Sequence, residues 1–153
     1  MKEIPLTQGK VAIVDDEDFE RVSQFKWHHS QGYALRALPR NGGQHRILSM
    51  HRFIMGDPIG IEVDHKKHGD TLNNRRSNLR LATKSQNGCN RGKQRNNTSG
   101  HKGVCWDSAK GKWRAEIKAG GKKFHLGRFR DKAEAAEAYK NAATKLHGEF
   151  THL

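Results

Sequence analysis

The stretch that decides the fold is EVDHKKHGDTLNNRRSNLRLATKSQNGCN, residues 62–90. A short apolar run ends in the adjacent pair Asp64 and His65, and a polar loop rich in glycine and asparagine follows. A second extended run begins at Asn78, and a helix-like segment then contains Asn87. The pattern predicts a strand, a long loop, a second strand and a helix. A carboxylate beside an imidazole, facing a carboxamide from the helix, can hold one hard divalent cation next to a general base.

Composition points to small modules and a polyanionic partner. The chain has 153 residues, 33% of them hydrophobic, with a mean hydropathy of −0.96, which is low for one large core. The net charge is +13. Residues 1–60 hold 8 basic and 7 acidic side chains, whereas residues 61–153 hold 21 and 9. Such a positive chain usually binds nucleic acid, and its basic part coincides with the Asp-His pair and everything after it.

Cysteine usage and hydropathy indicate a reduced, cytoplasmic setting. Cys89 and Cys105 are too far apart for a Cys-x-x-Cys pair, so a cysteine-rich zinc site is not expected. The first residues lack the apolar run of a signal peptide, and no run of the sequence is long enough to cross a bilayer. We therefore expect a protein that is neither secreted nor bound to a membrane.

The first sixty residues have the pattern of a small scaffold. Residues 10–14 are rich in β-branched side chains and predict a strand, and the acidic run 15–18 suits the start of a helix. Residues 33–38 and 45–50 predict two strands around the turn Asn41-Gly42-Gly43. Residues 50–55 predict a short helix that Gly56 ends; His51 and Arg52 on it are either solvated or contact phosphate.

The run V-D-H, then G-D-T-L-N-N-R-R-S-N-L-R-L-A-T, then N resembles the HNH nucleases, in the subgroup of phage and intron-borne homing endonucleases. The resemblance covers about residues 50–90 and implies a ββα-metal unit. It implies that Asp64 and Asn87 bind the metal, that His65 is the general base, and that Asn78 braces the loop that carries the base. The loop from His65 to Asn78 is one residue longer than the commonest family spacing.

The implied chemistry is hydrolysis of a phosphodiester by a water that His65 deprotonates. Oxygen ligands from a carboxylate and a carboxamide favour Mg²⁺, or Mn²⁺, over Zn²⁺. Alternatives remain open within the loop and the helix: His68 is a second candidate base, and Asn73, Asn74 and Asn90 compete for the two asparagine roles. Guanidinium groups match phosphate oxygens, so we expect DNA contacts from Arg75, Arg76 and Arg80.

The last third of the chain predicts a second module after the basic, wholly polar linker 91–100. Apolar residues alternate in three short runs, at 104–106, 113–117 and 124–126, joined by glycine-containing turns, which predicts a three-stranded antiparallel sheet. Asp131-Lys132-Ala133-Glu134 resembles a capping box, and the helix after it ends at His147-Gly148. The core is predicted to include four aromatic residues: Trp106, Trp113, Phe124 and Tyr139.

Residues 99–150 resemble the Apetala-two/ethylene-response-factor DNA-binding domain, through K-G-V, G-K-W-R-A-E-I, F-H-L-G-R-F, A-E-A-A-E-A-Y and H-G-E-F. The family commonly has arginines where Cys105 and Asp107 stand, so its base preferences are not transferred. The resemblance implies contacts with the major groove of DNA from one set of residues: Lys102, Arg114, Glu116, Lys118, Lys123 and His125.

Together these patterns predict an α+β chain: a small N-terminal sheet and a ββα-metal HNH unit in residues 1–90, a linker at 91–100, and a three-stranded antiparallel sheet packed on one helix in 101–153. The expected function is metal-dependent, site-directed cleavage of double-stranded DNA by a monomer or weak dimer, cutting one strand at a time. The competing reading is a DNA-binding regulator with an inactive HNH core. An RNA-binding accessory protein is a third and weaker reading.

Overall fold

The computed structural model describes residues 1–39 and 46–151. It forms two compact units, Met1–Thr83 and Lys84–Leu153, each with its own core. The helix that contains Asn87 thus belongs to the second unit. The predicted bounds of the domains and the linker stay a prediction. In the described ranges, no helix combines the length and apolar character that crossing a bilayer requires.

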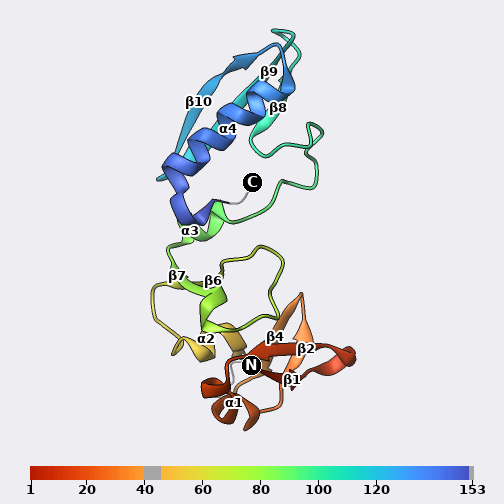
Figure 1. Cartoon of the computed structure of the whole chain (residues 1–153), viewed down its shortest axis with the longest axis vertical. Coiled ribbons are helices and arrows are strands. Elements are labelled where there is room, and N and C mark those ends of the chain that lie inside the picture. The colour runs from red at the N-terminus through yellow and green to blue at the C-terminus, as the bar shows by residue number, and fades with distance from the viewer. Residues whose placement is uncertain (40–45, 152–153) are drawn as a thin grey trace. The chain divides into compact units, whose positions relative to one another are not determined.

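The first unit is built from short strands and two short helices, as the sequence predicts for an α+β fold (Figure 1). Three antiparallel sheets order their strands β1-β2, β3-β4-β5 and β6-β7. The predicted turn at Asn41-Gly42-Gly43 lies outside the described residues. The elements are β1 (Lys2–Pro5), η1 (Thr7–Gly9), β2 (Val11–Val14), α1 (Asp16–Ser23), β3 (His28–Ser30), β4 (Tyr33–Ala37), β5 (Ile47–Ser49), α2 (Met50–Ile54), β6 (Glu62–His65), η2 (Arg76–Asn78) and β7 (Leu79–Ala82).

The core of the first unit joins the N-terminal sheet to the helices and to the β6-β7 hairpin. Val14, Val22 and Met50 are fully buried, and Val63 and Leu79 of the hairpin belong to the same cluster. Trp27 is buried in this core, and its indole N–H donates to the carbonyl of Val22 at 2.9 Å. The scaffold therefore holds the hairpin that carries Asp64 and His65.

The second unit has the predicted three-stranded antiparallel sheet, ordered β10-β9-β8, with one helix packed on it (Figure 1). Its core consists of small and aromatic residues, among them Ala115, Ala135 and Tyr139. The side chain of Asp131 accepts hydrogen bonds from two backbone N–H groups of the helix, as an N-cap does. The elements are α3 (Lys84–Cys89), β8 (Val104–Asp107), β9 (Lys112–Ala119), β10 (Lys122–Phe129), α4 (Lys132–His147) and η3 (Gly148–Phe150).

Two of the four predicted core aromatics of this unit are largely exposed. Trp106 is 50% exposed and Phe124 41% exposed, so their assignment to the core is wrong. Trp106 lies at the end of the short strand β8, where it packs edge-on against Trp113 with ring centroids 5.1 Å apart.

Candidate nuclease site and DNA-binding face

The β6-β7 hairpin places Asp64 and His65 at the end of a buried strand. Asp64 lies directly across from Arg80 in the register, and His65 lies across from Leu79. Oδ2 of Asp64 accepts hydrogen bonds from Nη2 of Arg80 at 2.8 Å and from Nε at 3.0 Å. Both side chains are less than a tenth exposed. Arg80 therefore orients the carboxylate of Asp64. Its predicted contact with DNA stays a prediction.

His65 is held by Asn74, one of the alternatives that the sequence left open. Nε2 of the imidazole lies 3.2 Å from Oδ1 of Asn74. The amide of Asn74 is oriented by its own Nδ2, which donates to the carbonyl of Leu72 at 3.1 Å. Oδ1 therefore faces the ring and accepts a hydrogen from Nε2. In the neutral imidazole this leaves the lone pair on Nδ1.

The N-terminal sheet positions Asn74. Ile13 of β2 donates its N–H to the carbonyl of Leu72 at 2.9 Å, and its carbonyl accepts from the N–H of Asn74 at 2.8 Å. The loop between β6 and β7 is thereby added to the edge of β2. This explains in structural terms why a scaffold precedes the Asp-His pair in the sequence.

Asn78 bonds to the backbone of the loop on both sides. Its Oδ1 accepts from the N–H of Lys67 at 3.1 Å, and its Nδ2 donates to the carbonyls of Asn73 at 2.9 Å and Asp70 at 3.3 Å. Gly69 has a φ of 81° in this loop, a conformation that glycine adopts without strain. These contacts agree with a bracing role for Asn78; its assignment to the catalytic set stays a prediction.

A second histidine, His51 of α2, packs against His65. The two ring centroids are 4.8 Å apart and nearly perpendicular, and Tyr33 lies 5.6 Å from one ring and 6.0 Å from the other. The pKa of His51 is lowered to about 3, mainly by burial and in part by the charges of His65 and Arg52. Burial also lowers the pKa of His65, against the opposing effect of its bond to Asn74. Both rings are therefore neutral near pH 7.

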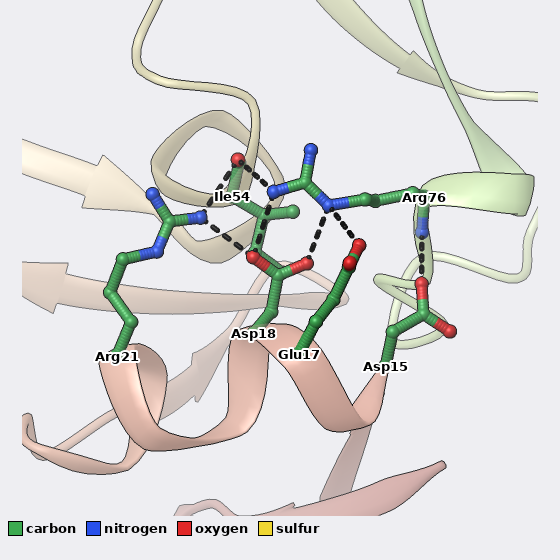
Figure 2. A network of polar contacts seen from close by, with 6 residues as sticks. All are labelled: Asp15, Glu17, Asp18, Arg21, Ile54 and Arg76. Carbon is green, nitrogen blue, oxygen red and sulfur yellow. Dashed lines mark hydrogen bonds and ion pairs between the residues drawn. The ribbon is translucent and has the colours of Figure 1, made fainter.

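Arg76, another predicted DNA contact, is part of a network that joins three elements (Figure 2). Its guanidinium bonds to Asp18 through Nε at 2.8 Å and Nη2 at 2.9 Å, and to Glu17 at 2.8 Å. Its backbone N–H donates to Asp15 at 2.8 Å. Arg21 also bonds to Asp18, at 2.7 Å.

The acidic groups of this network lie close enough together to suggest an ion site. They surround a guanidinium instead, so this cluster ties η2 to α1. The contact of Arg76 with DNA stays a prediction, as does that of Arg75, whose Nε donates to Oδ1 of Asn73 at 2.9 Å.

Asn87, the predicted second metal ligand, lies half-buried on α3. Because α3 belongs to the second unit, its role as a ligand stays a prediction.

The second unit gathers most of the other predicted DNA contacts on one face of its sheet. β9 and β10 pair Lys118 with Lys123 and Glu116 with His125. Ala115 and Ile117, which alternate with these residues on β9, are buried. The face opposite α4 carries Arg114, Glu116, Lys118, Lys123 and His125, and we call it the outer sheet face.

Glu116 organises the positive charges of this face. Its carboxylate forms ion pairs with Nζ of Lys123 at 2.7 Å and, more distantly, with Nε of Arg114 at 3.5 Å. The bond from Lys123 is the main reason why the pKa of Glu116 is lowered. Lys102 instead donates to the carbonyl of Cys89 at 2.7 Å, and burial lowers its pKa.

A crevice of about 1020 Å³ lies within the second unit. Residues of the basic linker line it together with four of the predicted DNA contacts: Lys102, Glu116, Lys118 and Lys123.

Sequence reasoning missed Arg128 and the contact between His51 of α2 and His65. Arg128 bonds to Asp107 at 2.9 Å on the outer sheet face. Strict alternation along β10 places Arg128 on the opposite face, toward α4. A register shift between His125 and Gly127 moves it, and no sequence signal except Gly127 indicates that shift.

Two family models match different parts of the chain. Residues 57–89 match the family model of the HNH endonuclease, and residues 99–149 match that of the AP2 domain. Protein 3.8 of Escherichia phage T7 is 38% identical over 96 residues, which cover 63% of this chain and 78% of the phage protein. A mimivirus protein from Acanthamoeba polyphaga mimivirus, named as an uncharacterized HNH endonuclease, is 31% identical over 150 residues, 94% of this chain and 74% of the relative. No solved structure matches the chain.

Proposed function

Because the chain belongs to the HNH endonuclease family, we propose that it hydrolyses phosphodiester bonds of double-stranded DNA, with His65 as the general base. The observation that carries the proposal is the bond between His65 and Asn74. That bond keeps the hydrogen on Nε2 and the lone pair on Nδ1, so Nδ1 is the atom that takes a proton from water. The water oxygen then bonds to phosphorus, and the bond to the 3′ oxygen breaks.

The donor chemistry of Asp64 fits a divalent cation. A carboxylate offers two oxygens with about four lone-pair sites, and such hard oxygens suit Mg²⁺ or Mn²⁺. Asp64 would hold the ion, with Asn87 as the second ligand that the sequence predicts. Such an ion supplies Lewis-acid stabilisation of the developing negative charge. Arg80 keeps the carboxylate in place, and Asn78 holds the loop beside it.

The AP2 domain makes the chain a DNA-binding protein, and we infer that it delivers the duplex to the nuclease unit at preferred sites, as in homing-type enzymes. The HNH match occurs once in the chain, so a chain that acts as a monomer cuts one strand in each binding event, and cutting both strands takes a dimer or two successive nicks. The two viral relatives are consistent with action in the cytoplasm of a host cell.

Supercoiled plasmid tests the proposal. The chain should produce open circles in Mg²⁺ and none in EDTA, and Asp64→Asn should bind DNA without producing them. Binding without relaxation by the unaltered chain would instead support the regulator with an inactive HNH core. Circular dichroism of Asp64→Asn checks that loss of activity is not loss of fold.

A further inference from the structure

The register of β10 places Arg128 on the outer sheet face, although regular alternation would place it on the side of α4. His125 pairs with Glu116, but Gly127, not Leu126, pairs with Ala115, so one residue is bulged out. Arg128 then pairs with Arg114 and shares its face. Gly127 has a φ of 139°, and a Cβ there would lie 2.9 Å from Cζ of Phe129. The bulge therefore depends on glycine and redirects Arg128.

Arg128 is also held in place. Its Nε donates to Oδ2 of Asp107 at 2.9 Å, and its Nη1 lies 3.4 Å from Nε2 of His125. Asp107 is on β8 and Arg128 on β10, so the pair reaches across the central strand β9. The bond from Arg128 is the first cause of a lowered pKa at Asp107. The side chain of Arg128 is 40% exposed, so a ligand can reach it.

The chemistry of this arrangement favours a base edge over a phosphate. With Nε bonded to Asp107 and Nη1 beside His125, Nη2 and the second hydrogen of Nη1 still make an edge with two donors. That edge makes two parallel hydrogen bonds with O6 and N7 of guanine in the major groove. Phosphate accepts the same fork, but the carboxylate of Asp107 lies directly beside this guanidinium and offsets its charge, which disfavours a second anion at the same place. Carboxylates are also acceptors for the N4 amine of cytosine.

Building on the proposed function, we propose that Arg128 determines sequence specificity by reading a guanine in the major groove, with Asp107 as the residue that orients its guanidinium. This assigns a base contact to β10, where the sequence predicts only Lys123 and His125. A lysine in place of Arg128 keeps the charge and loses the fork. Asp107→Asn keeps the shape and loses the charge that orients the fork.

Selection from a pool of randomised DNA duplexes tests the assignment, with the full chain in EDTA so that no duplex is cut. The unaltered chain should select a motif with guanine at one defined position. Arg128→Lys should weaken that one preference by about tenfold or more and leave the other positions unchanged. Asp107→Asn should weaken the same position less. Arg130→Lys, an exposed neighbour beyond β10, should select the original motif.

Three outcomes overturn the assignment: no guanine preference in the unaltered chain, the same motif from Arg128→Lys, or an equal loss at all positions. The last outcome identifies a phosphate contact. Circular dichroism of each variant excludes misfolding as the cause. Relaxation of plasmid by the unaltered chain in Mg²⁺ is scored separately, so failure of the nuclease proposal and failure of this assignment are distinguishable.

Discussion

His65 has two neighbours with different consequences. Asn74 fixes which nitrogen carries the hydrogen, through a bond of 3.2 Å. His51 packs on the ring without sharing that bond, and its own Nε2 lies 3.2 Å from Oγ of Ser49. A protonated His51 would place a positive charge in a buried site near Arg52, which the low pKa of His51 avoids.

That low pKa makes His51 a pH-dependent element of stability. Its pKa falls from 6.5 in the unfolded chain to about 3 in the folded one, so the unfolded chain binds more protons between these values. The free energy of unfolding should therefore fall as pH drops from 6.5 towards 3. His51→Gln should reduce the dependence of the unfolding free energy on pH. Urea unfolding measures this dependence, and hydrogen exchange of the amides in residues 1–83 assigns it to the first unit. An unchanged slope would contradict the assignment.

At the scale of elements, the Asp18 network joins α1 to η2 and to the last carbonyl of α2, at Ile54. Asp18→Asn should destabilise the first unit by about 1–3 kcal/mol, because the buried carboxylate loses its charge-assisted bonds. Solvent around the half-exposed Arg21 and Arg76 limits the loss. Asp16→Asn, which is 67% exposed, should cost less than about 0.5 kcal/mol. Equal effects in urea unfolding would refute a special role for the network.

The contact of α4 with the sheet depends on a glycine before β8. A Cβ on Gly103 would overlap the ring of Tyr139 and lie 2.6 Å from the carbonyl of Glu116, whereas one on Gly111 meets nothing within 4 Å. Both glycines have positive φ, 71° and 59°, so backbone strain is similar. Gly103→Ala should therefore destabilise the second unit by about 1–3 kcal/mol more than Gly111→Ala. Indistinguishable melting temperatures would contradict this packing.

At the scale of the molecule, the charge of +13 predicts DNA affinity that falls steeply with salt. Lys118→Gln, on the outer sheet face, should reduce the slope of log affinity against log salt by about 1. Lys140→Gln is the matched control on α4, which packs on the other side of the sheet. Fluorescence anisotropy with a labelled duplex measures both. A larger change for Lys140→Gln would indicate that DNA binds on the α4 side and not on the outer sheet face.

The sequence predicted the elements that local patterns specify. The apolar alternation predicts β8, β9 and β10, and the capping residue Asp131 predicts the start of α4. The Asp-His pair lies at the end of a strand, as the pattern of residues 62–65 predicts. The strands β1 and β3 were missed, because each is short and lacks an alternating apolar pattern.

Contacts between distant segments were beyond prediction. Arg76 meets Asp18 across 58 residues of sequence, so its charge pattern alone suggested DNA. The sequence favours Asn78 for the bracing role and leaves Asn74 as an alternative. The bond of Asn74 to His65, positioned by the backbone bond from Asn74 to Ile13 of β2, depends on a distant segment. The bulge at Gly127 changes the face of Arg128, which strict alternation cannot show.

The central claim is that His65 takes the proton from the attacking water, and one paired measurement tests it most directly. The rate of open-circle formation in Mg²⁺ is compared for the unaltered chain, His65→Gln and His68→Gln. His68 is the control because it is an exposed histidine in the loop that follows His65. His65→Gln should lose about 10²–10⁴-fold in rate, and His68→Gln should stay close to the unaltered chain. Full activity of His65→Gln, or its loss in His68→Gln alone, would contradict the account.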